Sequence, residues 1–182
     1  MSTGHRDAQV SALDWALSAM GEATRRLEEM PAGDLPRGLA AISEAVWWVT
    51  LVDATLVRYH PGDYDLILAR HEPDERHAIE DTLGGLRFVR NKMGHDLDPA
   101  DFARPPGGRP AAQDELLAWV WQTVPEQAGD RGQEWELARH QSFETQLTGR
   151  PIGETFTRAA AFLRLVAAVA GVSAEAVGAR PS

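Results

Sequence analysis

The chain has 182 residues, 43% of them hydrophobic and 25% charged, and a formal net charge of −9. This length and composition predict one globular domain over residues 1–182 and exclude a disordered chain. The sequence contains no cysteine, which excludes disulfides, thiolate zinc sites and cysteine nucleophiles. No apolar run is long enough to span a membrane, and the first residues, MSTGHRDAQ, lack the apolar segment of a secretion signal. We therefore expect a cytoplasmic protein with no membrane partner.

Apolar residues recur every three or four positions in the first part of the chain, which predicts two long helices. The first helix carries its apolar face from Val10 to Leu27, and a turn rich in proline and glycine follows. The second helix is expected from about Leu39 to Tyr59 and to stop at Pro61-Gly62-Asp63. Trp47 and Trp48 widen its apolar face and are expected in the core.

A third helix is predicted to begin near Pro73, because proline suits the first helical turn, and to end at Gly94. The spacing of its apolar residues turns one face inward: Ile79, Leu83, Leu86 and Met93. Asp98-Pro99 is expected to cap and begin a short further element. A loop rich in proline and glycine is predicted over 104–112, and it includes RPPGGRP.

Residues 113–182 are predicted to form further helices that pack back on the first part of the chain. A short helix is expected over Glu115–Val124, with Trp119 and Trp121 in the core or an interface, and another over Glu134–Leu147. Gly149-Arg150-Pro151 is predicted to turn the chain into a final amphipathic helix. The fold class is therefore all-α, a bundle of long antiparallel helices with shorter helices added.

The segment TLGGLRFVRNKMGH, residues 82–95, is the best candidate for chemistry. It has no acidic residue, and it holds four groups that can carry positive charge: Arg87, Arg90, Lys92 and His95. The net charge of the whole chain argues against unspecific coating of nucleic acid, so this local patch is the expected place for an anion. Arg90 falls inside the apolar face of the third helix. It either pairs with a neighbouring carboxylate or lines a cleft that faces a second subunit.

The sequence RNKMGH, residues 90–95, resembles the motif of HEPN domains, in which an arginine and a polar residue precede a histidine. The resemblance extends by helix order over about residues 1–103, with the motif near the end of a long internal helix. It implies a metal-independent endoribonuclease that acts as a homodimer and needs no cofactor. RNA is then the substrate, and cleavage proceeds through attack of its own 2′-hydroxyl.

The residue types of the motif suit this chemistry. His95 titrates near neutral pH and can act as general acid or base, and Arg90 can hold the scissile phosphate and offset its transition-state charge. Asn91 would bind the phosphate or orient the imidazole, while Arg87 and Lys92 would contact the RNA backbone. Residues five apart on a helix are separated by about 140° around its axis. Either Gly94 ends the helix and redirects the histidine, or the site combines groups from two chains.

The chain departs from the toxin branch of this family, whose members often carry a tyrosine two residues after the histidine for modification by an antitoxin. Leu97 occupies that position here, so this route of neutralisation is not expected, although an antitoxin or regulatory protein stays a candidate partner.

HEPDERH, residues 71–77, has the wrong spacing for a zinc site and is expected to be a solvated polar face. The alternative function is a non-catalytic helical module that binds a partner, a nucleotide or another anion.

Overall fold

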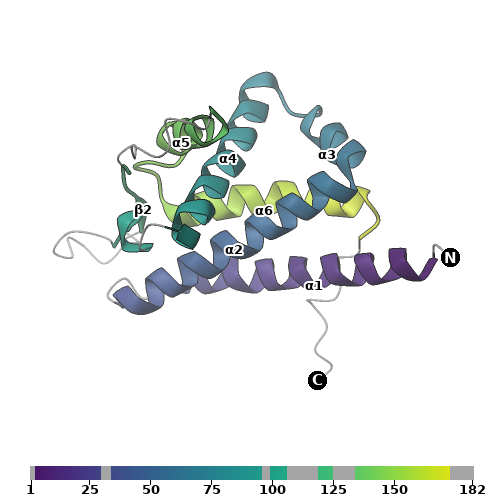
Figure 1. The fold of residues 1–182 in the computed structure, drawn as a ribbon, viewed down its shortest axis with the longest axis horizontal. Helices are drawn as coiled ribbons and strands as arrows, with labels where there is room; N and C mark the ends of the chain where they lie inside the picture. Colours follow the sequence, from purple (N-terminus) through teal and green to yellow (C-terminus); the bar gives the residue numbers. More distant parts are fainter. Residues whose placement is uncertain (1–2, 30–33, 96–98, 106–118, 125–133, 173–182) are drawn as a thin grey trace.

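A computed structural model describes residues 3–29, 34–95, 99–105, 119–124 and 134–172 (Figure 1). The described elements are, in chain order, α1 (Thr3–Glu28), α2 (Leu35–Tyr59), α3 (Pro61–Leu68), α4 (Pro73–His95), a short 3₁₀ helix η1 (Pro99–Asp101), β1 (Ala103–Arg104), β2 (Val120–Trp121), α5 (Glu134–Gln146) and α6 (Ile152–Val169). This arrangement confirms the predicted all-α fold.

Helix α2 lies at the centre of the bundle. It packs against α1, α4 and α6, and Figure 1 shows α2 crossing the middle of the view in the direction opposite to α1, which lies along the bottom. Three helical neighbours explain why its apolar face is wider than one partner helix could cover. Helix α2 is long enough to cross a membrane, and its mean hydropathy of 1.4 is high enough. The core helix of a globular bundle can meet the same two criteria.

Helix α3 is absent from the sequence prediction. Pro61 does end α2, as expected, but it is also the first residue of α3, and the backbone N–H of Tyr64 bonds to the carbonyl of His60. The same Pro-Gly pair therefore separates two helices. Proline can do this because it ends one helix and is favoured in the first turn of the next.

Helices α4 and α5 approach each other closely at two glycines. A Cβ added to Gly84 would lie 3.2 Å from the Ser142 hydroxyl, and one added to Gly85 would lie 2.9 Å from a methyl of Leu147. At Gly85 the added Cβ would also lie 3.0 Å from the backbone Cα of Phe143, so a side chain there would press against the α5 backbone. Gly94 was predicted to end α4, but the helix continues through His95.

The segment before α5 differs from the prediction. A helix was expected over Glu115–Val124, but the described part of it contains strand β2, which pairs antiparallel with β1 so that Ala103 faces Trp121. Arg104 therefore belongs to a strand and not to the expected loop, whose residues 106–112 lie outside the described residues, as do 113–118. The backbone N–H of Trp121 also bonds to the carbonyl of Arg150. These long-range bonds satisfy the backbone and outweigh the local helical pattern.

The sequence prediction holds for the burial of three of its tryptophans and not for Trp47. Trp119 and Trp121 are buried, as expected, and Trp48 is partly buried against the core. Trp47, also expected in the core, is 50% exposed. Pro99 begins η1, as predicted, whereas its expected cap Asp98 lies outside the described residues.

The turn before α6 forms as predicted. Gly149 has a φ of +78°, a left-handed conformation that favours glycine, and α6 then begins at Ile152. Helix α6 packs on α1 and α2. It also contributes large side chains, among them Phe156 and Leu163, to the hydrophobic core that the other helices share.

Candidate functional site

Arg90 lies where α4 faces α2, at a surface cavity of about 330 Å³. Its guanidinium carbon is 4.9 Å from the centre of the Trp47 ring, a distance at which a cation and an indole attract each other. The half-exposed ring of Trp47 therefore supports a charged group at the surface. The cavity is lined by Ser43, Glu44, Val46, Trp47, Arg90, Met93 and Gly94.

Arg90 has no carboxylate at ion-pair distance within the part of the chain that the structure describes. The only acidic residue among those that line the cavity is Glu44, and its carboxylate is 2.6 Å from a guanidinium nitrogen of Arg26 on α1. Glu44 is therefore already paired with another cation. Arg90 keeps its charge available at a partly exposed cavity, which is what binding of an external anion requires.

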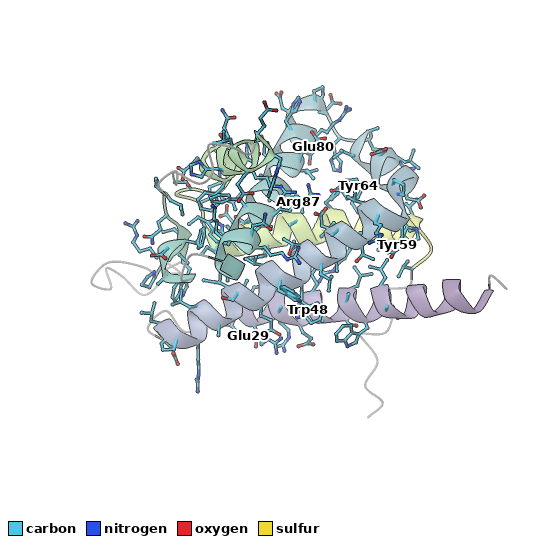
Figure 2. The ribbon with its side chains drawn as sticks, viewed as in Figure 1. Glu29, Trp48, Tyr59, Tyr64, Glu80 and Arg87 are labelled. Atoms are coloured by element: carbon cyan, nitrogen blue, oxygen red, sulfur yellow. The ribbon has the colours of Figure 1, made fainter. Side chains whose placement is uncertain are left out.

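Arg87, one turn earlier on α4, is paired inside the bundle. Its Nε and Nη2 both lie 2.6 Å from Oδ2 of Asp53, and the Tyr64 hydroxyl donates to Oδ1 of the same carboxylate at 2.9 Å. Figure 2 labels Arg87 on α4 and Tyr64 on α3. Asp53 is completely buried in α2. Burial raises the pKa of the Asp53 carboxyl, whereas Arg87 and Tyr64 oppose that rise. The trio joins α2, α3 and α4 at one buried point.

Asn91 and Lys92 both point toward α5. The Lys92 ammonium is 3.9 Å from Oε1 of Glu136, and the Asn91 amide nitrogen lies 3.4 Å from Oε2 of the same carboxylate. Lys92 is only 6% exposed. A segment that contains no acid of its own is thus largely neutralised by Asp53 and Glu136, which come from distant parts of the sequence. A role of Arg87, Asn91 and Lys92 in contacting RNA stays a prediction.

His95 is the last residue of α4, and its side chain lies outside the described part of the structure, as does Leu97. Because α4 is helical through His95, positions 90 and 95 stand about 140° apart around its axis. Redirection of His95 by a helix end at Gly94 is wrong, because α4 includes both residues. The combination of groups from two chains stays a prediction.

Sequence reasoning missed the residues that α5 brings to this region. Glu136 is buried against α4, and the guanidinium carbon of Arg139 lies 4.7 Å from the centre of the exposed Trp135 ring. Burial lowers the pKa of Arg139, and the positive charges of Arg87 and Arg90 lower it further. The spacing of Trp135 and Arg139, one helical turn, was readable from the sequence. Their proximity to α4 was not.

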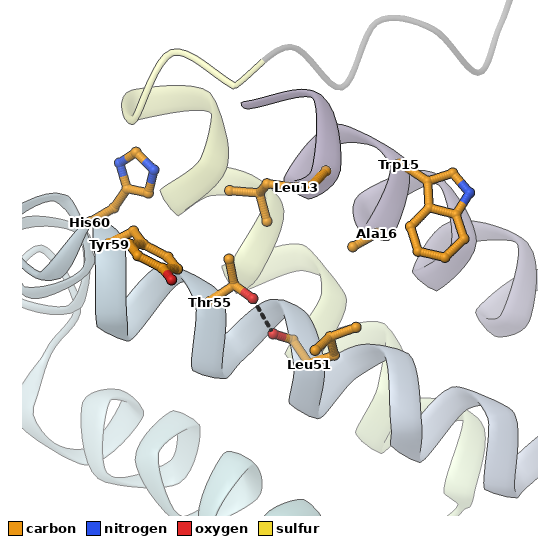
Figure 3. Close-up of a pocket in the computed structure, with 8 residues that line it drawn as sticks. Leu13, Trp15, Ala16, Leu51, Thr55, Tyr59 and His60 are labelled. Carbon is orange, nitrogen blue, oxygen red and sulfur yellow. Dashed lines mark hydrogen bonds between the residues drawn. The ribbon is translucent and has the colours of Figure 1, made fainter. Parts of the chain in front are cut away.

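A second cavity, of about 300 Å³, lies between α1 and α2 (Figure 3). This cavity is mostly apolar. The Thr55 hydroxyl at its edge donates a hydrogen bond to the carbonyl of Leu51 at 2.7 Å. The described residues that line it include no carboxylate, guanidinium or ammonium group: Ala12, Leu13, Trp15, Ala16, Leu51, Thr55, Tyr59 and His60. It is a poorer candidate for binding an anion than the cavity at Arg90.

The rival motif HEPDERH lies at the start of α4. The His71 Nδ1 atom is 3.1 Å from a carboxylate oxygen of Glu75, and His77 is exposed. The described residues contain no group of three or more His, Asp or Glu side chains that could hold a metal ion.

No family model, curated protein or solved structure matches this chain.

Proposed function

We propose that this chain is a metal-independent endoribonuclease of HEPN type. One observation carries the proposal: Arg90, the first residue of the RNKMGH motif, stacks on Trp47 at a partly exposed cavity, with no carboxylate partner among the described residues. A guanidinium held in this way can bind a phosphate without first breaking an internal ion pair. Its planar donors suit two phosphate oxygens at once.

The reaction that suits these groups needs only proton transfer and charge stabilisation. The 2′-oxygen of a ribose attacks the adjacent phosphorus as His95 takes its proton, and the bond from phosphorus to the 5′-oxygen breaks. The leaving oxygen takes a proton from water, and the protonated His95 returns its proton to water. The products are a 2′,3′-cyclic phosphate and a 5′-hydroxyl, and Arg90 offsets the charge of the pentacoordinate transition state.

The divergence of positions 90 and 95 around α4 requires two chains in this proposal. Arg90 of one subunit would act with His95 of the partner subunit, so the enzyme would be a homodimer. We expect light scattering at micromolar concentration to give the mass of a dimer. A monomer that still cleaves RNA would contradict the shared site.

The test is incubation of purified protein with RNA, with and without EDTA. We expect Arg90→Ala and His95→Ala each to lower the rate by about 10² to 10⁴, the usual size of such contributions, and EDTA to change nothing. Arg58→Ala is the matched control, because that guanidinium also stacks on an aromatic ring, Tyr59, at 5.3 Å, and it lies toward the other end of α2. Mixing the two inactive variants should restore part of the activity through mixed dimers. Undiminished cleavage by both single variants would contradict the proposal.

A second candidate is a non-catalytic module that binds a nucleotide or another anion. The pairing of Arg87 with Asp53 and of Lys92 with Glu136 favours it, because Arg90 is then the one cation of the described motif without an acidic partner. Binding of a nucleotide that depends on Arg90, together with RNA that stays intact, would establish this function instead of the nuclease.

A further inference from the structure

Helix α5 carries a second guanidinium that rests on an exposed indole. Arg139 lies over Trp135 at 4.7 Å, and Arg90 lies over Trp47 at 4.9 Å. Both tryptophans are 50% exposed, and both arginines are partly exposed. Neither arginine has a carboxylate at ion-pair distance over the residues that the structure describes. One pair joins α4 to α2 and the other lies within α5, and both are partly exposed to solvent.

The contacts between α4 and α5 bring these pairs to one region of the surface. The two helices are antiparallel, because Ser142 bonds to Asp81 near the start of α4, whereas Glu136 contacts Asn91 near its end. Arg139 follows Glu136 by about one turn and so lies closer to the level of Arg87. Burial is the main cause of the lowered pKa of Arg139; the charges of Arg87 and Arg90 add to it and those of Glu136 and Asp53 oppose it, which agrees with this placement.

The charge balance of this region favours an anionic ligand. Of the three arginines, only Arg87 is neutralised, by the buried Asp53. Arg90 and Arg139 repel each other, and partial burial strengthens that repulsion, so a bound anion would relieve it. In a chain with a net charge of −9, two guanidiniums on adjoining helices, neither with a carboxylate at ion-pair distance among the described residues, are a specific local feature.

We propose that Arg139 and Trp135 bind a single-stranded segment of RNA next to Arg90. This inference rests on the proposed function and names the form of its substrate. Each guanidinium would exchange its contact with the indole for a phosphate, and the uncovered ring would stack on a base. Aromatic stacking of this kind requires bases that are not paired in a duplex, which is why the site would select single strands.

Binding and cleavage can be measured separately with RNA that lacks the nucleophile. We would titrate a fluorescent 2′-O-methyl oligonucleotide, which cannot be cleaved by 2′-hydroxyl attack, and follow its anisotropy. Arg139→Gln and Trp135→Leu should each weaken binding about tenfold, and Arg139→Gln should reduce the dependence of log affinity on log salt by about 0.7. A duplex of the same sequence should bind at least tenfold more weakly than the single strand.

The controls match each substitution in chemistry. Arg58→Gln removes another guanidinium from an aromatic ring, and Trp15→Leu removes another exposed indole, one that lines the apolar cavity between α1 and α2. Both should bind the oligonucleotide within about twofold of the unaltered protein. Thermal unfolding of all four variants shows whether each is folded at the temperature of the titration.

Equal affinity of Arg139→Gln, Trp135→Leu and the unaltered protein would overturn the inference, and so would equal affinity for single strand and duplex. If an RNA with intact 2′-hydroxyls is cleaved with dependence on Arg90 and His95 but binding ignores α5, the proposed function stands and this inference fails. If binding depends on Arg139 and Trp135 but the RNA is never cleaved, the inference stands and the nuclease proposal fails.

Discussion

The buried carboxylate of Asp53 should be one of the most sensitive positions for stability. It is fully buried and accepts hydrogen bonds from Arg87 at 2.6 Å and from the Tyr64 hydroxyl at 2.9 Å. Asp53→Ala would leave the guanidinium and the phenol facing each other without an acceptor. Removing one member of a buried ion pair costs about 3–5 kcal/mol. Because the Arg87 side chain is 35% exposed and can turn partly to water, we expect a loss of about 3 kcal/mol, at the lower end of that range.

Two further variants test the reasoning from both sides. Tyr64→Phe removes one neutral donor while Arg87 still holds the carboxylate, so its cost should be about 1 kcal/mol. The double variant Asp53→Leu, Arg87→Leu removes both charges, and we expect it to cost well under the sum of the two single changes.

Urea unfolding followed by circular dichroism gives these free energies, provided that the slope with denaturant is unchanged. A cost of less than about 1 kcal/mol for Asp53→Ala would refute the argument that this carboxylate organises the interior. Strictly additive costs in the double variant would refute the coupling between Asp53 and Arg87.

Further predictions concern the helix contact and alkaline pH. Gly85→Ala should destabilise the protein by about 1–2 kcal/mol in urea, because its Cβ would lie 3.0 Å from the backbone Cα of Phe143 as well as 2.9 Å from a Leu147 methyl, and overpacking outweighs the gain in helix propensity. Gly94→Ala, with nothing within 4 Å, should instead stabilise α4 by about 0.5 kcal/mol, and equal effects of the two changes would contradict the packing argument. Burial, together with the neighbouring Asp53, raises the pKa of Tyr64 above its ordinary value of 10.0. The unfolded chain then releases this proton first, so the free energy of unfolding should fall as pH rises above 10, by up to about 1.4 kcal/mol per pH unit. In Tyr64→Phe the free energy of unfolding should fall less steeply above pH 10. Identical slopes for this variant and the unaltered protein would contradict the role of Tyr64.

The long helices were predictable because their apolar residues repeat over many turns. The predicted helices around Leu13, Ile42, Leu83, Phe143 and Leu163 all exist, and these residues are buried. The strands escaped prediction because each has only two residues, too few to show a period. Their backbone partners come from remote segments, which no local pattern reveals.

The candidate site was predictable only in part. Arg90 was expected either to pair with a carboxylate or to line a cleft between subunits, and it lies against Trp47 at a surface cavity with no carboxylate at ion-pair distance among the described residues. A second subunit across that cavity stays a prediction. The partners of Arg87 and Lys92 were not predictable, because Asp53 lies 34 positions before Arg87 and Glu136 belongs to a helix much later in the chain. A charge pattern along one segment says nothing about acids that the fold brings beside it.

The pairing of Asp53 with Arg87 also sets an order in which the chain can be completed during synthesis. The two residues are 34 positions apart, so at about 5–20 residues per second Arg87 leaves the ribosome roughly 2–7 s after Asp53. Until then the apolar helix α2 carries a carboxylate whose partner in the folded protein has not yet been made. The hairpin of α1 and α2 can therefore form early, but its inner face has to stay hydrated until α4 arrives. A chaperone that recognises apolar segments would find its target in the nascent chain during that interval.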